Sequence, residues 1–182
     1  THYLDIDSLG QAYRARKISP IEVLNHYLNR INELDSQLKS YATVMSDSAQ
    51  KAAKELTKEL ETGTDRGPLH GIPIAVKDLC FTKGTKTMGG TAVLEDFVPS
   101  FDSTVVSRLQ DAGAIILGKL NLTEGAMGGY NPKRQAPRNP WNHNKWAGSS
   151  SSGSGVATSM GLCAGSLGSD TGGSIRFPSA AC

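Results

Sequence analysis

Cysteine is scarce in this sequence, and long apolar runs are absent from it. Cys80, Cys163 and Cys182 are widely spaced and form neither a CxxC pair nor a Cys/His cluster, so zinc ligation is not indicated and free thiols in a reducing compartment are expected. No apolar run approaches the roughly 20 residues that a membrane-spanning helix needs, and the polar stretch THYLDIDSLG does not resemble a signal peptide. We therefore expect a cytoplasmic protein without a membrane partner.

An excess of charge of either sign is also missing. Lys and Arg number 19 and Asp and Glu number 17, so the formal net charge is +2. This balance provides no general electrostatic attraction to nucleic acid, to a membrane surface or to acidic substrates. Lys133, Arg134 and Arg138 lie close together, but no aromatic residue is interleaved among them, so direct nucleic-acid binding is not expected.

The patterns that are present predict helices in the first half of the chain. With 182 residues, of which 38% are hydrophobic, the chain can bury the core of one domain. Ser19, Pro20 and Glu22 have the spacing of a capping box with proline in the first turn, which predicts that a helix begins there. A second helix is predicted from about residue 46 to residue 61, ending at Gly63.

Further along, the pattern changes to short apolar runs. Residues 72–76 and 114–118 are predicted to be buried strands, with a capped helix from Asp102 to Gln110 between them. The order strand, helix, strand indicates an α/β fold. Lys77 then stands at the C-terminal end of a strand, whereas residues 131–146 are rich in proline and asparagine and are predicted to be a loop.

A serine- and glycine-rich segment spans residues 148–155. A flexible linker is one interpretation of this composition, but the segment continues into an apolar run that a linker would lack. A phosphate-binding loop is another, because Gly148 and Gly153 have the G-x-x-x-x-G spacing. The lysine that should follow is missing, since Ser154 and Gly155 occupy those places. Neither interpretation accounts for the whole region, which leaves a hydrolytic site.

The run Thr171-Gly172-Gly173-Ser174 favours such a site. Two glycines allow consecutive amides to turn toward one point without obstruction by a Cβ atom, and Ser174 offers a nucleophile there. A serine hydroxyl needs a base within hydrogen-bond reach and donors aimed at the developing oxyanion.

The base is harder to identify. No histidine lies in the serine-rich region, although a Ser-His-Asp triad remains open; the four histidines are His2, His26, His70 and His143. Lys77 is the alternative, because a lysine acts as a base only when neutral, and the preceding apolar run could bury it. Its neighbour Asp78 argues partly against a neutral amine, so a surface salt bridge is the competing interpretation.

These residues resemble the amidase signature family, serine hydrolases that use a Ser-Ser-Lys triad. The resemblance is carried by four segments, at residues 148–178, 71–78, 121–124 and 138–141. It implies that Lys77 is the base, Ser174 the nucleophile and Ser150 the relay serine, which the family holds in a cis peptide conformation. Ser151 is the adjacent alternative, because four successive serines blur the register. Ser149 stands where the family usually has glycine or another small apolar residue, and Ser152 replaces a common glycine at a position that tolerates serine. These departures put the local loop geometry in question more than the activity.

The resemblance carries further expectations. It assigns the oxyanion hole to the amides of Thr171, Gly172, Gly173 and Ser174, and a bracing role to Asp170 and Arg176. It implies a mixed central sheet covered by helices on both faces. Residues 1–182 would form the N-terminal part of a single amidase signature domain, with the C-terminal remainder absent, since domains of this family are more than twice as long.

The activity implied is hydrolysis of carboxylic amides, without a metal or organic cofactor. The expected partner is a small-molecule amide, and a homo-oligomer is possible. A second implied function is the glutaminase (A) subunit of a tRNA-dependent amidotransferase, which would require partner subunits. From another class, a non-catalytic binding protein could retain the same fold.

Overall fold

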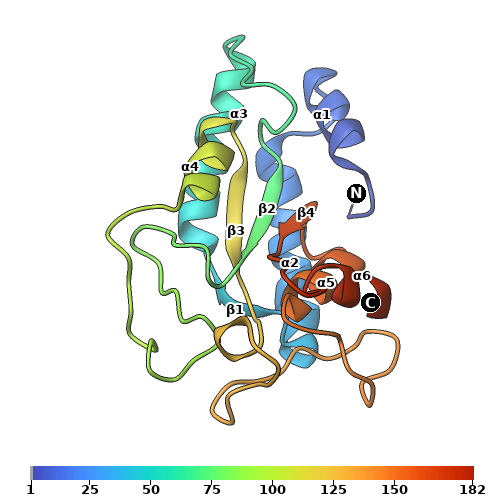
Figure 1. The fold of residues 1–182 in the computed structure, drawn as a ribbon. Helices are drawn as coiled ribbons and strands as arrows, with labels where there is room; N and C mark the ends of the chain where they lie inside the picture. The colour runs from blue at the N-terminus through green and yellow to red at the C-terminus, as the bar shows by residue number, and fades with distance from the viewer. Residues whose placement is uncertain (1) are drawn as a thin grey trace.

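A four-stranded mixed β-sheet forms the centre of the computed structural model, which describes residues 2–182 (Figure 1). Its strands are β1 (Tyr41–Val44), β2 (Pro73–Lys77), β3 (Ile115–Leu120) and β4 (Gly165–Leu167), in the order β1-β3-β2-β4. β2 runs parallel to β3 and to β4, whereas β1 is antiparallel to β3. Pro73 is the first residue of β2, so this internal strand can contain a proline.

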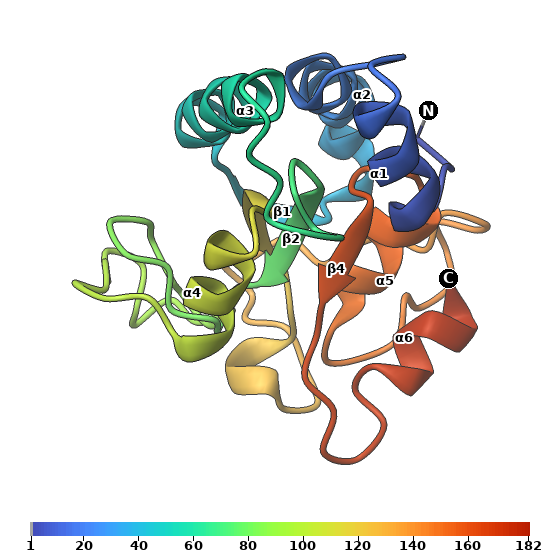
Figure 2. The ribbon, with the colours of Figure 1, turned by 90° about the horizontal axis from the view of Figure 1, so that it is seen from above.

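Helices cover both faces of this sheet. They are α1 (Ile6–Arg14), α2 (Pro20–Leu38), α3 (Ser46–Glu61), α4 (Thr104–Asp111), α5 (Ser152–Ser159) and α6 (Arg176–Ala181), with a short 3₁₀ helix at Glu124–Ala126. Seen from above, α1, α2 and α3 lie together on one side of the sheet and α4 lies on the other (Figure 2). The expected α/β fold with a mixed, two-sided sheet is confirmed.

The core is divided between the two faces by the alternation of side chains along each strand. Ile115 and Leu117 of β3 belong to the large cluster that contains Leu24 and Tyr27 of α2. Ile116, which lies between them, packs in a smaller cluster with Val106 of α4. Successive strand residues point to opposite faces, so a strand buried on both faces is largely apolar. This is why the sequence run at residues 114–118 is continuous and does not alternate.

The predicted helix starts differ in accuracy. The capping box of α2 is confirmed, because the Glu22 amide donates to Ser19 Oγ (3.3 Å) and the Ser19 amide donates to Glu22 Oε2 (2.8 Å). The helix α4 begins at Thr104, two residues later than predicted, and Asp102 does not cap it. Asp102 Oδ1 instead accepts from the amide of Lys83 (2.7 Å), so its carboxylate ties down the preceding loop.

Two expectations from the composition concern the state of the cysteines and the length of apolar helices. All three cysteines are free thiols in the described structure. Among the helices of residues 2–182, none is both long and apolar enough to cross a membrane.

Candidate active site

One edge of the sheet brings the chemically active segments together. β2 and β4 are parallel, so their carboxyl ends lie at the same edge, where Lys77 ends β2 and Ser169 and Asp170 follow β4. The serine-rich segment runs into α5, which begins at Ser152 and packs on β2 and β4. The carboxyl ends of parallel strands are the usual place for a site in an α/β fold.

Lys77 is completely buried at this edge. Its Nζ atom donates hydrogen bonds to three hydroxyls: Ser150 Oγ (2.6 Å), Ser151 Oγ (2.9 Å) and Ser169 Oγ (2.9 Å). Burial lowers the pKa of Lys77 to about 8, against the smaller raising effects of Cys80 and Asp170. A lysine with such a pKa can lose its proton near neutral pH, which an exposed lysine cannot do.

The two serines nearest Lys77 have different surroundings. Ser151 Oγ also donates to the carbonyl of Ser169 (3.2 Å) and accepts from the Ser169 amide (3.2 Å), so it fastens the segment that follows β4. The hydroxyl of Ser150 contacts Lys77 alone among the described residues, and the peptide bond between Ser149 and Ser150 is cis. Ser150 thus has the hydroxyl with capacity left for a further partner.

Ser174 lies in the loop between β4 and α6 and is half-buried. Its carbonyl accepts from the Ser151 amide (3.0 Å), which joins the loop to the serine-rich segment. Within residues 2–182 its hydroxyl makes no hydrogen bond, so the side chain is free to meet a partner. The direct Ser174–Ser150 contact that a relay requires is not formed in this conformation.

The carboxylate of Asp170 binds several backbone amides of the loop that carries Ser174. Asp170 Oδ1 accepts from the Gly173 amide (2.8 Å), and Asp170 Oδ2 accepts from the amides of Ile175 (2.9 Å) and Arg176 (3.1 Å). The Arg176 guanidinium adds a bidentate pair, with Nε donating to Oδ2 (3.0 Å) and Nη2 to Oδ1 (2.8 Å). This guanidinium, together with the amides, holds the pKa of Asp170 well below its usual range.

The contacts of Asp170 engage one of the four backbone amides at residues 171–174 and leave the other three without a partner among the described residues. The Gly173 amide is already satisfied by Asp170, whereas the amides of Thr171, Gly172 and Ser174 have no protein partner among the described residues. Gly173 has φ +117°, a conformation that other L-residues rarely adopt. Three of the four amides are therefore available to an acceptor.

The competing interpretations of the serine-rich segment do not fit its environment. Ser150, Ser151 and Ser152 are buried, which a flexible linker would not be. The amides that a phosphate loop would offer are used within the protein, since the Ser151 amide donates to Ser174 and the Gly153 amide donates to the carbonyl of Asn121 (3.0 Å). Residues 148–151 thus form a packed loop, and residues 152–155 are the first half of α5.

The histidines lie away from these residues. His70 is buried, where Nδ1 accepts from the Arg66 amide (3.0 Å) and Nε2 lies 2.9 Å from the carbonyl of Leu56. His2 and His26 contact one another at 3.1 Å, and His143 is exposed. Among residues 2–182 no histidine bonds to Lys77, Ser150 or Ser174, so a histidine triad is not formed.

Two polar contacts near the site were missed by the sequence patterns. Lys119 of β3 is fully buried and pairs with Asp78, with 3.2 Å between Nζ and Oδ1. Tyr130 donates its hydroxyl to Ser152 Oγ (2.6 Å), which anchors the loop before the serine-rich segment. A lysine inside an otherwise apolar strand was the available signal for the first contact, since a buried charge needs a partner.

Comparison with known proteins supplies an independent line of evidence. The family model described as Amidase matches residues 22–182. AmiD of Mycobacterium tuberculosis (strain ATCC 25618 / H37Rv), itself only provisionally assigned as an amidase, is 51% identical over 98% of this chain and 38% of its own length. The A subunit of the glutamyl-tRNA(Gln) amidotransferase of Prochlorococcus marinus (strain NATL2A) is 43% identical over 98% of this chain and 37% of its own length.

A solved structure agrees with these relatives. The native peptide amidase of Stenotrophomonas maltophilia superposes with a TM-score of 0.90 at 34% identity, covering 98% of this chain and 38% of that one. The chain therefore spans 37–38% of the length of these two curated relatives.

Proposed function

The chain belongs to the amidase family, and on that premise we propose that it contributes the catalytic groups of an amidohydrolase, which cleaves carboxylic amide C–N bonds through a serine acyl-enzyme intermediate. One observation carries the proposal. Lys77 is buried at the carboxyl edge of the sheet, in contact with three serine hydroxyls and with no carboxylate partner among residues 2–182. A lysine in that setting is suited to accept a proton.

The proposed acylation begins with neutral Lys77. Its amine takes the proton of Ser150 as Ser150 takes the proton of Ser174, and Ser174 Oγ adds to the amide carbonyl carbon. The oxyanion of the tetrahedral intermediate accepts from the free amides at residues 171, 172 and 174. Return of the proton through Ser150 to the amide nitrogen allows the C–N bond to break, and the amine leaves. No metal or organic cofactor takes part in these steps.

Deacylation uses the same groups in reverse. Water takes the place of the amine, loses a proton through Ser150 to Lys77, and adds to the acyl carbon. Collapse of the second intermediate releases the carboxylic acid and returns the proton to Ser174 Oγ. The missing Ser174–Ser150 contact is consistent with this scheme, because catalytic hydrogen bonds are often long before a substrate is bound.

A fluorophosphonate probe tests the proposal without knowledge of the substrate. Such a reagent phosphonylates an activated serine, so intact-mass and peptide analysis should locate the adduct on Ser174. Ser174→Ala should abolish labelling, and Lys77→Met should slow it strongly. Labelling at another serine, or unchanged labelling of the Lys77→Met protein, would contradict the proposal. A complete failure of the wild-type protein to react would support the non-catalytic binding function instead.

A second candidate function follows from the amidotransferase relatives. Several relatives between 39% and 44% identical are A subunits of glutamyl-tRNA(Gln) amidotransferases. The same serine chemistry would then release ammonia from glutamine, and partner subunits would be needed. Ammonia release from glutamine, compared with turnover of simple aryl and aliphatic amides, distinguishes the two functions. A small-molecule amide is the proposed substrate in both cases.

A further inference from the structure

The carboxylate of Asp78 presents a problem for the proposed site. Asp78 directly follows Lys77 in the chain and is also buried, with 1% of its side chain exposed. A carboxylate beside a lysine ordinarily keeps the lysine charged, because the ion pair stabilises the ammonium form. A charged Lys77 could not take a proton from Ser150.

Strand geometry separates the two side chains. Lys77 and Asp78 are consecutive, and the Asp78 amide continues the β2–β3 ladder by donating to the carbonyl of Leu120 (2.9 Å). Consecutive residues of a strand point to opposite faces. Lys77 faces the serine-rich segment, and Asp78 faces the other way, toward the side where Val76 packs against α4.

Lys119 meets Asp78 on that opposite side. Lys119 of β3 is the register partner of Val76, so both side chains occupy the same face. Its Nζ atom lies 3.2 Å from Asp78 Oδ1 and donates to Thr87 Oγ1 (2.6 Å), and its side chain is completely buried. Apart from this ion pair, Asp78 Oδ1 has no hydrogen-bond partner among the described residues. Lys119 is thus what compensates this buried oxygen.

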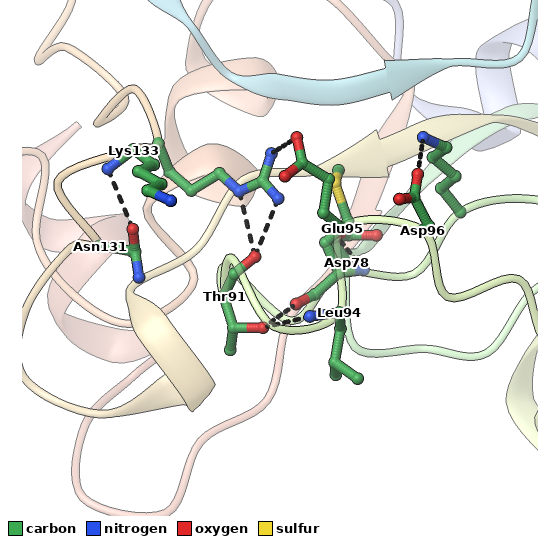
Figure 3. Close-up of polar contacts among 10 residues, drawn as sticks. Asp78, Thr91, Leu94, Glu95, Asp96, Asn131 and Lys133 are labelled. Carbon is green, nitrogen blue, oxygen red and sulfur yellow. Dashed lines mark hydrogen bonds and ion pairs between the residues drawn. The ribbon is translucent and has the colours of Figure 1, made fainter.

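Two backbone amides also donate hydrogen bonds to Asp78. Asp78 Oδ2 accepts from the Met88 amide (3.0 Å), and the Asp78 carbonyl accepts from the Gly89 amide (3.0 Å). Figure 3 shows Asp78 beside the loop that carries Thr91 and Leu94. The residue that follows Lys77 is therefore held by its side chain and by both of its main-chain polar groups.

The other charged groups near this pair are already engaged. Arg134 donates two hydrogen bonds to the carbonyl of Thr91 (3.1 and 2.9 Å), and its guanidinium lies 3.8 Å from the Glu95 carboxylate. The Cys80 thiol is half-buried, and burial raises its pKa, so it stays uncharged near neutral pH. Within residues 2–182, Lys119 is the cation that remains for Asp78.

We propose that Lys119 is a positioning residue: by pairing with the Asp78 carboxylate on the far face of the sheet, it compensates that charge and leaves Lys77 able to lose its proton and act as a base. This inference rests on the proposed function of Lys77. The Asp78–Lys119 pair carries no net charge. Loss of Lys119 leaves an uncompensated carboxylate one residue away from Lys77, and loss of Asp78 leaves an uncompensated cation on the neighbouring strand. The sign of that charge decides how Lys77 responds.

The pKa directions agree with the geometry. Burial lowers the pKa of Lys77, and the carboxylate that opposes this effect is that of Asp170, not that of its neighbour Asp78. Burial also raises the pKa of Asp78, and Lys119 is the largest influence in the opposite direction.

The test is the pH dependence of fluorophosphonate labelling at Ser174 in the intact protein. Three variants are compared with the wild type: Lys119→Met, Asp78→Asn, and the double variant Asp78→Asn/Lys119→Met. Lys86→Met is the matched control, because Lys86 also pairs with an aspartate, Asp96 (2.9 Å), but both side chains are exposed. Thermal unfolding of each protein monitors the fold separately.

Opposite shifts are expected from the two single variants. Lys119→Met raises the pKa of Asp78 further, but Lys77 titrates near pH 8, where we expect the Asp78 carboxyl to be ionised still; the uncompensated carboxylate should then move the midpoint of labelling up by about 0.5–1 pH unit. Asp78→Asn leaves a cation and should move it down by about the same amount. The double variant, which removes both charges, should return the midpoint to the wild-type value, and Lys86→Met should not move it.

A purely structural pair would lower thermal stability without these signed shifts. An unchanged or lowered midpoint for Lys119→Met, or a double variant that keeps the shift of Lys119→Met, overturns the inference. If Lys119→Met does not fold, Asp78→Asn decides: a lowered midpoint supports the inference, and an unchanged or raised one overturns it. If Lys77→Met labels like the wild type, the proposed function itself fails, and this outcome is distinct from all the others.

Discussion

The amine nitrogen of Lys77 lies 2.6 Å from the hydroxyl oxygen of Ser150, although 73 positions separate the two residues in the chain. The contact forms where β2 ends and where the segment before α5 crosses the carboxyl edge of the sheet. Both side chains are buried, so water does not compete for the hydrogen bond. This relationship is the basis of the proposed reaction and of the predictions that follow.

Replacing Lys77 by methionine should remove the base while preserving the shape of the side chain. We expect Ser174 labelling and amide turnover to fall by about 10²–10⁴-fold, the usual contribution of a general base. Thermal unfolding should show a folded protein, because the apolar side chain no longer carries the desolvation cost of a buried charge. Labelling kinetics measure the effect, and a loss below about tenfold would contradict the assignment of Lys77.

The rate should depend on pH through Lys77. Its pKa is about 8, so about one tenth of the molecules carry the neutral amine at pH 7. The reactive form is the deprotonated one, and the labelling rate of Ser174 should therefore rise with pH and level off above about pH 8–9. A pH series of labelling rates checks this. A rate that falls as pH rises from about 6 to about 9 would be incompatible with a lysine base.

Ser150 and Ser151 should differ in the kind of defect that their loss causes. Ser150→Ala removes the hydroxyl closest to Lys77 and should slow labelling by about 10–10³-fold, with some rate retained if water bridges the gap. Ser151→Ala removes the contacts that fasten Ser169 and should mainly lower the unfolding temperature. The pair is its own matched control, and the reverse pattern would move the relay role to Ser151.

Asp170 should control the order of the loop that carries Ser174. Asp170→Ala removes the acceptor of three backbone amides and of Arg176, so the amides at residues 171–174 lose their fixed arrangement. We expect labelling to fall by about tenfold or more, as when an oxyanion donor is misplaced. Limited proteolysis should cut near residues 170–176 faster than in the wild type.

A control for the Asp170 prediction lies on the surface. Asp96 also accepts from a lysine, but it is 91% exposed at the side chain and holds no catalytic segment. Asp96→Ala should leave both labelling and proteolysis unchanged. Equal effects of the two substitutions would show that the loop does not depend on Asp170.

The start of α2 offers a test of the fold itself. Ser19 accepts from the Glu22 amide and Glu22 closes the box, so Ser19→Ala should destabilise the protein by about 1 kcal/mol. Chemical denaturation measures the change. Ser8→Ala is the comparison, since Ser8 donates only its backbone amide to the Asp5 cap, and it should cost less. No effect on labelling is expected from either substitution.

Local signals in the sequence were sufficient for several elements. The capping box at Ser19 and the end of α3 near Gly63 depend on contacts within a few residues, so spacing alone predicts them. Short or weakly patterned elements escaped prediction, and α1, β1 and β4 are the examples. β4 has three residues that include Gly165 and Ser166, and it is a strand only because it pairs with β2.

The candidate site also has features that the sequence predicted and features that it did not. Gly172, Gly173 and Ser174 are adjacent, so their chemistry could be inferred from the sequence, and the position of Lys77 at a strand end followed from one apolar run. The partner of Asp78 could not be inferred, because Lys119 lies on the next strand of the sheet and reaches Asp78 only through the pairing of β2 with β3. The same holds for the choice between Ser150 and Ser151, which depends on what each hydroxyl touches.

The sequence by itself determined the types of residue, their local order and the turns that glycine permits at Ser174. The tertiary structure alone decided which charges meet, which hydroxyls face Lys77 and which amides are left free. The physical reason is range: caps and turns form between neighbours in the chain, whereas burial, ion pairing and the pKa of Lys77 depend on groups that come together only when the sheet is assembled.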